Sequence, residues 1–167
     1  MGKVISLKTR RNIEMQGFLG LDDLQIAQLD GWLRFSPLVC LTWTAAGLWL
    51  ASPTVIAALV PFALLGGILK RHPFDAVYNY GLRFFAGGPK IPAYGKPRKF
   101  GCLMASAVLS LTAAAFYAGV PAAGYALGGL MIALASVNVT TGFCVPSYTY
   151  AKIFGPVRRT GTVRSAG

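Results

Sequence analysis

The sequence predicts an all-α, polytopic membrane protein with four transmembrane helices, arranged as two parallel-repeat hairpins that are each followed by a short amphipathic interfacial helix. Of the 167 residues, 54% are hydrophobic and 13% are charged, whereas soluble domains carry roughly 25% charged residues. Residues 35–69 and 100–151 contain no Lys, Arg, Asp or Glu, over 35 and 52 residues respectively. Since about 20 helical residues cross a hydrocarbon core, each stretch is long enough for two crossings.

Turn signals divide each charge-free stretch into two helices. Ser52-Pro53-Thr54 interrupts the first stretch, with Ser52 placed to cap a helix and Pro53 in its first turn, where a missing N–H costs nothing. Gly119-Val120-Pro121 interrupts the second stretch in the same way. The first two helices are short for a spanning pair, so a re-entrant first hairpin is the alternative. The expected helices are 36–51, 54–70, 101–119 and 123–144.

The basic residues predict the orientation. The chain has 16 Lys and Arg against 5 Asp and Glu, a net charge of +11, and all 16 lie outside the charge-free stretches. By the positive-inside rule, both termini and the central segment face the cytoplasm, against anionic headgroups of the bilayer. The bilayer accounts for the net charge, so a nucleic-acid partner is not expected. The predicted segments are a cytoplasmic or interfacial N-terminal segment (1–35), hairpin 1 (36–70), a cytoplasmic basic interfacial segment (71–100), hairpin 2 (101–144) and a cytoplasmic basic tail (145–167).

A similar stretch follows each hairpin. Both copies begin at a proline, pass through Tyr-x-Tyr, a basic residue and a phenylalanine, and stop at Gly-Pro, over residues 73–89 and 146–156. Proline in the first turn and Gly-Pro at the end are helix start and stop signals. In the first copy, one helical face carries apolar and aromatic side chains, which predicts a helix lying in the headgroup region. These side chains are Val77, Tyr80, Phe84 and Phe85.

Two further segments lie outside the hairpins. Residues 1–35 surround Asp22-Asp23 with leucines and other apolar residues, which predicts a surface helix that starts at the two aspartates. Residues 87–97 contain three prolines and three glycines and are expected to form an exposed linker.

The cysteines and the single histidine are the candidates for chemistry. Cys40 and Cys102 begin the first and third crossings, Cys144 ends the fourth, and His72 follows the second, so alternating helix directions bring all four to one membrane boundary. The set is a weak candidate for a soft metal such as zinc. Cys144 is the candidate redox thiol, with His72 and Asp75 as neighbours. Inert packing of small, buried cysteines is the simplest interpretation.

Other polar or small residues have structural explanations. Asp75 lies in the first turn of the predicted surface helix, where a carboxylate meets free N–H groups. Gly124 and Gly128 have the spacing that lets helix backbones approach closely, and Asn138 is expected to hydrogen-bond within the bundle. The crossings carry no ionisable side chain, which argues against ion pumps and proton-coupled carriers. No cofactor is predicted.

Two motifs resemble those of a known family. Arg71-His72-Pro73-Phe74-Asp75, followed by Tyr78-Asn79, and Thr141-Gly142-Phe143-Cys144 are similar at the same spacing to the bacterial membrane proteins catalogued as domain of unknown function 4395. The resemblance extends over about residues 25–155. It implies a four-helix protein of the bacterial inner membrane and no established activity. Some family members have a second cysteine three residues after the one that matches Cys144. This chain has Ser147 at that position.

The sequence favours a non-enzymatic accessory, scaffold or assembly component of the membrane, working with a protein partner or as a homo-oligomer. The alternative is a thiol-redox or sulfur-handling membrane protein that acts through Cys144. A small channel or carrier for an uncharged solute is the least favoured hypothesis, because polar residues do not line two or more helices.

Overall fold

The computed structural model describes residues 5–155, and within this range the chain is helical, without strands. The described elements, in chain order, are α1 (Leu7–Met15), α2 (Asp23–Leu29), a 3-10 turn (Trp32–Arg34), α3 (Phe35–Trp49), α4 (Pro53–Ile68), α5 (Pro73–Val77), a π-helical turn (Tyr78–Leu82), α6 (Arg83–Ala86), α7 (Lys96–Tyr117), α8 (Pro121–Thr141) and α9 (Val145–Phe154). The last three arginines of the predicted basic tail lie outside the described residues.

The four long helices agree with the predicted hairpins to within a few residues. Ser52 caps α4 as expected, because its hydroxyl accepts a hydrogen bond from the N–H of Val55 at 3.4 Å. The largest difference is at α7, which begins at Lys96 rather than at 101. Pro97 falls in the first turn of that helix, where its fixed φ and missing N–H are tolerated, so the basic residues before the charge-free stretch are helical too.

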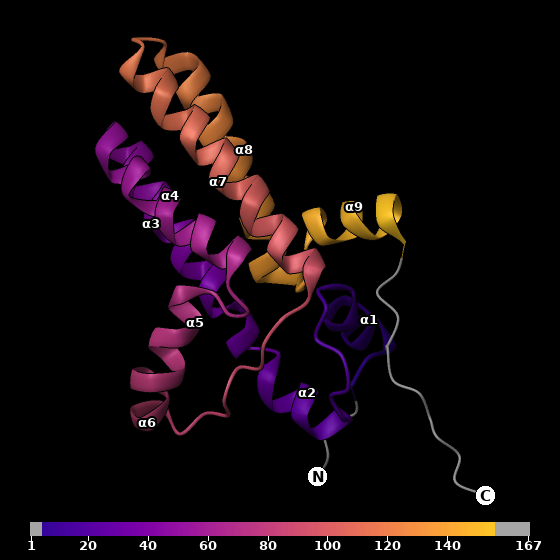
Figure 1. Cartoon of the computed structure of the whole chain (residues 1–167). Coiled ribbons are helices and arrows are strands. Elements are labelled where there is room, and N and C mark those ends of the chain that lie inside the picture. Colours follow the sequence, from indigo (N-terminus) through magenta and orange to yellow (C-terminus); the bar gives the residue numbers. More distant parts are fainter. Residues whose placement is uncertain (1–4, 156–167) are drawn as a thin grey trace, which may run out of the picture.

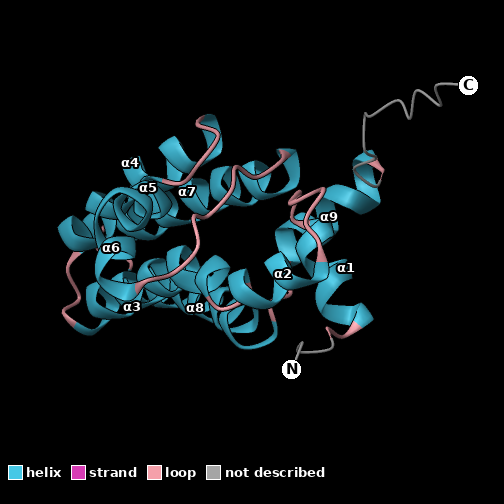
Figure 2. Ribbon diagram, turned by 90° about the horizontal axis from the view of Figure 1, so that it is seen from below, coloured by secondary structure: helices cyan, strands magenta, loops and turns pink. Residues whose placement is uncertain are grey.

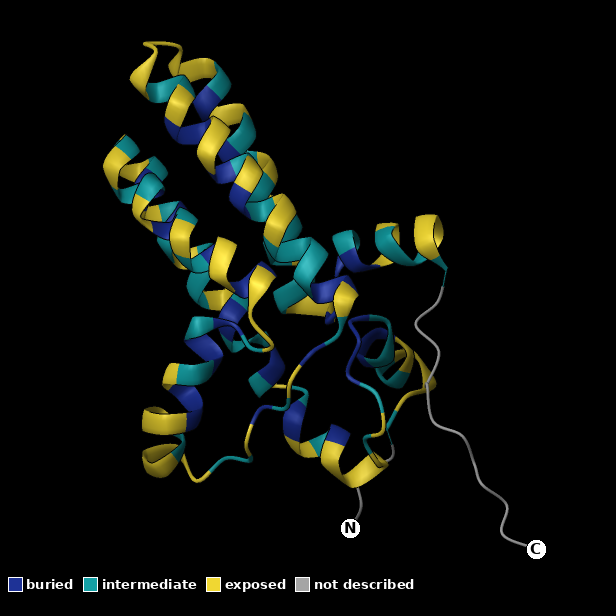
Figure 3. Ribbon diagram, viewed as in Figure 1, coloured by how far each residue is buried: buried dark blue, intermediate teal, exposed yellow. Residues whose placement is uncertain are grey.

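The two hairpins pack side by side into a four-helix bundle (Figure 1). α4 lies against α7 and α3 lies against α8, while each hairpin also packs internally. The centre of the bundle is apolar, and its most buried side chains come from α4 and α7, namely Ile56, Leu59, Ala63, Leu109 and Ala113. The outer faces of the long helices are largely exposed (Figure 3), and many of the exposed side chains are apolar. Such a surface suits a lipid environment.

Two of the described helices, α7 and α8, are long and apolar enough to cross a membrane by themselves. α3 has 15 residues and α4 has 16, fewer than the roughly 20 that a full crossing takes. α4 together with α5 and α6 would pass as a third span, although the chain bends by 82° between them. The structure therefore establishes two to three candidate spans, and crossing by all four long helices stays a prediction.

The short helices gather at the end of the bundle opposite the hairpin turns (Figure 1). Seen from that end, α5 and α6 lie on one side and α1, α2 and α9 on the other (Figure 2). A second apolar core joins α1, α2, the 3-10 turn, the π-helical turn and the loop before α7. It is formed by Ile13, Phe18, Ile26, Leu29, Leu33, Tyr78, Ile91 and Tyr94. α2 begins after Asp22, which forms a capping box with Gln25, so the predicted surface helix is confirmed. α1 was not expected from the sequence.

Residues 87–97 do not form an exposed linker, so this prediction was wrong. Ile91 is fully buried and Tyr94 is 5% exposed. The Asn79 amide pairs with the backbone of Ile91, donating to its carbonyl at 3.0 Å and accepting from its N–H at 2.8 Å. The Tyr94 hydroxyl donates to the carbonyl of Gly66 at 2.7 Å. These hydrogen bonds replace the backbone pairing that a proline- and glycine-rich segment cannot make for itself.

The N-terminal segment caps the carboxyl end of α8. The Gln16 amide donates to the carbonyl of Gly142 at 2.9 Å, and the Asn12 amide donates to that of Thr141 at 3.4 Å. Arg34 donates to the carbonyls of Val139 and Thr140, both at 2.9 Å. The last carbonyls of a helix have no partner within it, so residues far apart in sequence supply the missing donors.

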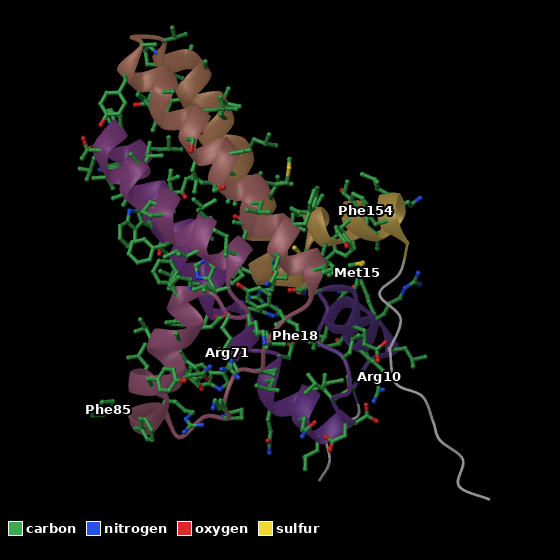
Figure 4. The ribbon with its side chains drawn as sticks, in the orientation of Figure 1. Arg10, Met15, Phe18, Arg71, Phe85 and Phe154 are labelled. Carbon is green, nitrogen blue, oxygen red and sulfur yellow. The ribbon has the colours of Figure 1, made fainter. Side chains whose placement is uncertain are left out.

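The two helices that follow the hairpins differ in their packing. Residues 73–86 form one helical stretch with a π-helical turn in its middle. Its predicted apolar face is exposed, with Tyr80 and Phe84 each at 71% and Phe85 at 93%, and Phe85 points away from the rest of the molecule (Figure 4). In the first copy of the Tyr-x-Tyr motif Tyr78 is fully buried, whereas in the second copy Tyr148 is exposed.

Candidate functional site

A pocket of about 340 Å³ lies where the bundle meets the layer of short helices. Its walls toward the middle of the bundle are apolar, and they include Val108, Leu109, Leu130, Met131 and Leu134. At the other end it is lined by polar and sulfur-containing side chains from the ends of several elements, namely Ser36, Cys40, His72, Arg98, Cys102, Asn138 and Cys144. The pocket therefore combines an apolar interior with a polar end.

All three cysteines line this pocket and are free thiols. Cys40 and Cys102 lie within α3 and α7 and are half-buried, while Cys144 is 7% exposed. Cys144 does not end the fourth helix as expected. α8 stops at Thr141, and Gly142 follows in the left-handed conformation. Cys144 occupies the position just before α9, without a side-chain hydrogen bond to that helix. The thiol thus lies at an amino end, where the free N–H groups and the positive end of the helix dipole are found.

His72 is buried at the start of α5, with 3% of its surface exposed. Its Nδ1 accepts a hydrogen bond from the N–H of Phe74 at 3.3 Å. Burial, with a smaller effect from Arg98, lowers the pKa of His72 to about 4, so the imidazole is neutral near pH 7. Because Nδ1 is the acceptor, the single ring proton of the neutral form is on Nε2.

Gly66 leaves the space in which His72 and Cys102 meet. A Cβ on Gly66 would lie 3.0 Å from His72 Nε2 and 3.2 Å from Cys102 Sγ. A methyl group at this position in α4 would collide with the imidazole. The absence of a side chain at Gly66 therefore allows the imidazole and the thiol to come together beside the same helix.

Asp75 and Arg98 form a loose, buried ion pair beside the pocket. Asp75 is fully buried, and its Oδ2 lies 4.0 Å from Arg98 Nη2. Among residues 5–155, neither carboxylate oxygen has a hydrogen-bond partner, and Arg98 Nη1 and the Ser36 hydroxyl have none either. Burial raises the pKa of Asp75, while Arg98 and the neighbouring Ser36 lower it. The carboxylate makes no hydrogen bond to the start of α5, so His72, not Asp75, caps this helix.

Arg98 is held in place by contacts with three other residues. Its Nη2 donates to the carbonyl of Leu33 at 3.1 Å, and its guanidinium lies over the rings of Phe18 and Tyr94. Sequence reasoning did not find Arg98 or Tyr94 as site residues. Arg98 belongs to a run of basic residues in which no local signal separates the buried side chain from the exposed ones.

The remaining predicted site residues are distributed as follows. Asn138 lines the pocket from α8. Gly124 and Gly128 are buried, the first against the ring of Phe116 and the second against Leu48, so this face of α8 packs against α7 and α3.

Within residues 5–155, no three His, Cys, Asp or Glu side chains are grouped so that they could hold a metal ion. The weak metal set of Cys40, His72, Cys102 and Cys144 therefore shares the pocket without forming a ligand cluster.

Acidification is expected to destabilise the protein through His72. The pKa of His72 is about 4 in the folded chain and 6.5 ordinarily, so the unfolded chain takes up the proton first and stability is lost as the pH falls below 6.5. Between about pH 7 and about pH 5 the loss is about 2 kcal/mol. Asp75, with its raised pKa, acts in the opposite sense.

The measurement is the free energy of unfolding in detergent micelles across this pH range, for the wild type and for His72→Asn. Asparagine keeps an acceptor for the helix cap but does not titrate, and both proteins retain Asp75. The difference between the two proteins isolates His72, and a difference independent of pH would contradict the prediction.

A family model described as "Domain of unknown function (DUF4395)" matches residues 31–154, a range that contains the bundle, the pocket and α9. No curated protein and no solved structure matches the chain.

Proposed function

We propose that this chain, which belongs to the DUF4395 family of unknown function, is a membrane thiol protein that reacts through Cys144. The proposal is inferred from the chain's own residues. One observation carries the proposal: cysteines from three separate elements line a single pocket together with His72. Packing residues have no need to share a cavity. The pocket therefore favours thiol chemistry over a purely structural role for the cysteines.

The reaction class that suits this arrangement is thiol–disulfide exchange with a partner. The Cys144 sulfur, as a thiolate, attacks a disulfide of the partner; the partner's S–S bond breaks, a mixed disulfide forms, and one partner sulfur leaves as a thiolate. A second thiol of the pocket then attacks the Cys144 sulfur, which releases the partner as a dithiol and leaves a disulfide in this chain. The partner gains two electrons, and the two thiols of this chain lose them.

The second thiol has to come from another element, because residue 147 is a serine. Cys102 is the candidate: it lines the same pocket, and the Cys144 sulfur lies 3.8 Å from the point that a Cβ on the adjacent Gly101 would occupy. The proposal includes a bacterial inner-membrane location, crossing by both hairpins, and the layer of short helices on the cytoplasmic side. The basic residues around that layer support this orientation.

The proposed thiol function is tested by the rate of maleimide labelling of each cysteine in native membranes, using variants that keep one cysteine and replace the other two with serine. We expect the Cys144 thiol to react at least about tenfold faster than those of Cys40 and Cys102, because a helix of ten residues begins at it. A mixed disulfide with a partner should then be trapped in the Cys102→Ser variant. Equal, slow labelling of all three cysteines until the protein is unfolded would contradict the proposal.

A non-enzymatic accessory role is the second candidate, and a different observation favours it. The apolar faces of α5–α6 and of α9 are exposed, with Phe85 at 93% and Phe154 at 65%. These faces offer contact area to a membrane partner or to a second copy of the chain. This role would move to first place if the three thiols prove inert.

A further inference from the structure

We propose that the pocket binds a neutral amphiphile of the quinone class, whose carbonyl oxygen accepts a hydrogen bond from His72. The inference goes beyond the proposed thiol function, because it names a ligand for the pocket in which the thiols lie and gives that ligand no step in the thiol–disulfide exchange. Binding and thiol reactivity are separate measurements, so either can fail alone.

The first argument is a donor that the pocket offers. His72 lines the pocket and uses Nδ1 as an acceptor, which leaves Nε2–H as a donor beside Cys102. Arg98 Nη1 and the Ser36 hydroxyl also have no hydrogen-bond partner among the described residues, but both atoms are closed off from the pocket by their burial. A buried donor without an acceptor costs about 1–3 kcal/mol, so an acceptor oxygen beside His72 would remove a penalty.

The second argument is the charge balance, which selects a neutral acceptor over an anion. Asp75 lies 4.0 Å from Arg98 and is fully buried, so the positive charge of Arg98 already has a counter-charge. A carboxylate or phosphate entering the pocket would be a second anion against one cation, and burying an uncompensated charge is costly. A carbonyl oxygen can accept from the Nε2–H of His72 without adding charge.

The third argument is the shape and lining of the pocket. Beyond the polar end, the walls are apolar side chains from α7 and α8, including Leu109, Met131 and Leu134. The volume of about 340 Å³ is within the range of small-molecule sites. An apolar ring with carbonyl oxygens matches this lining, and Cys102 and Cys144 line the same cavity.

The test uses the full chain, purified in detergent micelles, with decylubiquinone as the probe and native mass spectrometry to count bound quinone. The blocking variant is Ala105→Phe, because Ala105 lines the pocket from α7. The matched control is Ala107→Phe, the same substitution at an exposed position of the same helix. We expect Ala105→Phe to weaken binding at least tenfold, which is about 1.4 kcal/mol, and Ala107→Phe to bind like the wild type.

A further variant reports on the donor. His72→Leu removes the Nε2–H donor and should weaken quinone binding severalfold, with its folding checked by thermal unfolding. Equal binding by the two phenylalanine variants, or displacement of the quinone by dodecanoate at equal concentration, would overturn the inference. Pocket-dependent quinone binding with three inert thiols would uphold it and reject the thiol function instead.

Discussion

Arg98→Met is expected to destabilise the protein by about 3–5 kcal/mol. Asp75 is fully buried, and among the described residues it forms an ion pair with Arg98. Removing one partner of a buried pair leaves an uncompensated charge, which is the costly part of the change. The substitution also leaves the Leu33 carbonyl without its donor. The measurement is the free energy of unfolding by urea in detergent micelles.

The double variant Arg98→Met with Asp75→Leu serves as the control. It removes both charges and should recover most of the lost stability, because replacing a whole buried pair by apolar groups is often close to neutral. If the double variant is no more stable than Arg98→Met alone, the loss comes from packing against Phe18 and Tyr94 rather than from the unpaired carboxylate. That result would contradict the electrostatic explanation.

Gly17→Ala is expected to cost about 3 kcal/mol, the second large effect. Gly17 follows α1 with φ at +89°, a conformation that L side chains rarely adopt. A Cβ here would also lie 2.6 Å from the Cα of Gly95, and a backbone atom cannot move aside as a side chain can. The substitution would push the N-terminal segment away from the loop that precedes α7.

Gly20→Ala separates the two contributions to this cost. Gly20 has nearly the same backbone conformation, with φ at +84°, but no atom lies within 4 Å of the point that a Cβ would occupy. This variant should therefore lose about 1 kcal/mol from backbone strain alone. Thermal unfolding of both variants gives the comparison. Equal losses would mean that the close approach of Gly17 to Gly95 contributes nothing to the cost.

The hairpins could be predicted from the sequence because their signals are local. A charge-free stretch, a capping serine and a proline in the first turn each act within a few residues, so the bounds of α4 agree closely with expectation. α1 has a capping serine, Ser6, but no charge-free stretch and no proline in its first turn, and it is polar, with Lys8, Arg10 and Arg11 along its length. Its place depends on side chains that reach α8, and a contact over such a separation leaves no trace in the local sequence.

The candidate site was predictable in part for the same reason. Alternating helix directions predicted that Cys40, Cys102, Cys144 and His72 would lie near one another, and all four line one pocket. The partner of Asp75 could not be identified, because a loop expected to be exposed folds inward and places Arg98 beside the carboxylate. The predicted position of Cys144 was also wrong: the residue was expected at the end of α8 and lies at the start of α9. The turn at Gly142 ends α8, and α9 follows directly.

The cap that the N-terminal segment forms on α8 has a consequence for biosynthesis. Gln16 and its acceptor Gly142 are separated by 126 positions, so the ribosome has made all four helices of the bundle before this contact can form. Until α8 is complete, the N-terminal segment lacks the carbonyls to which it binds. A nascent chain that stalls within the second hairpin would leave Asn12, Gln16 and Arg34 without their carbonyls, and proteases that survey unfinished membrane proteins would meet an open polar surface there.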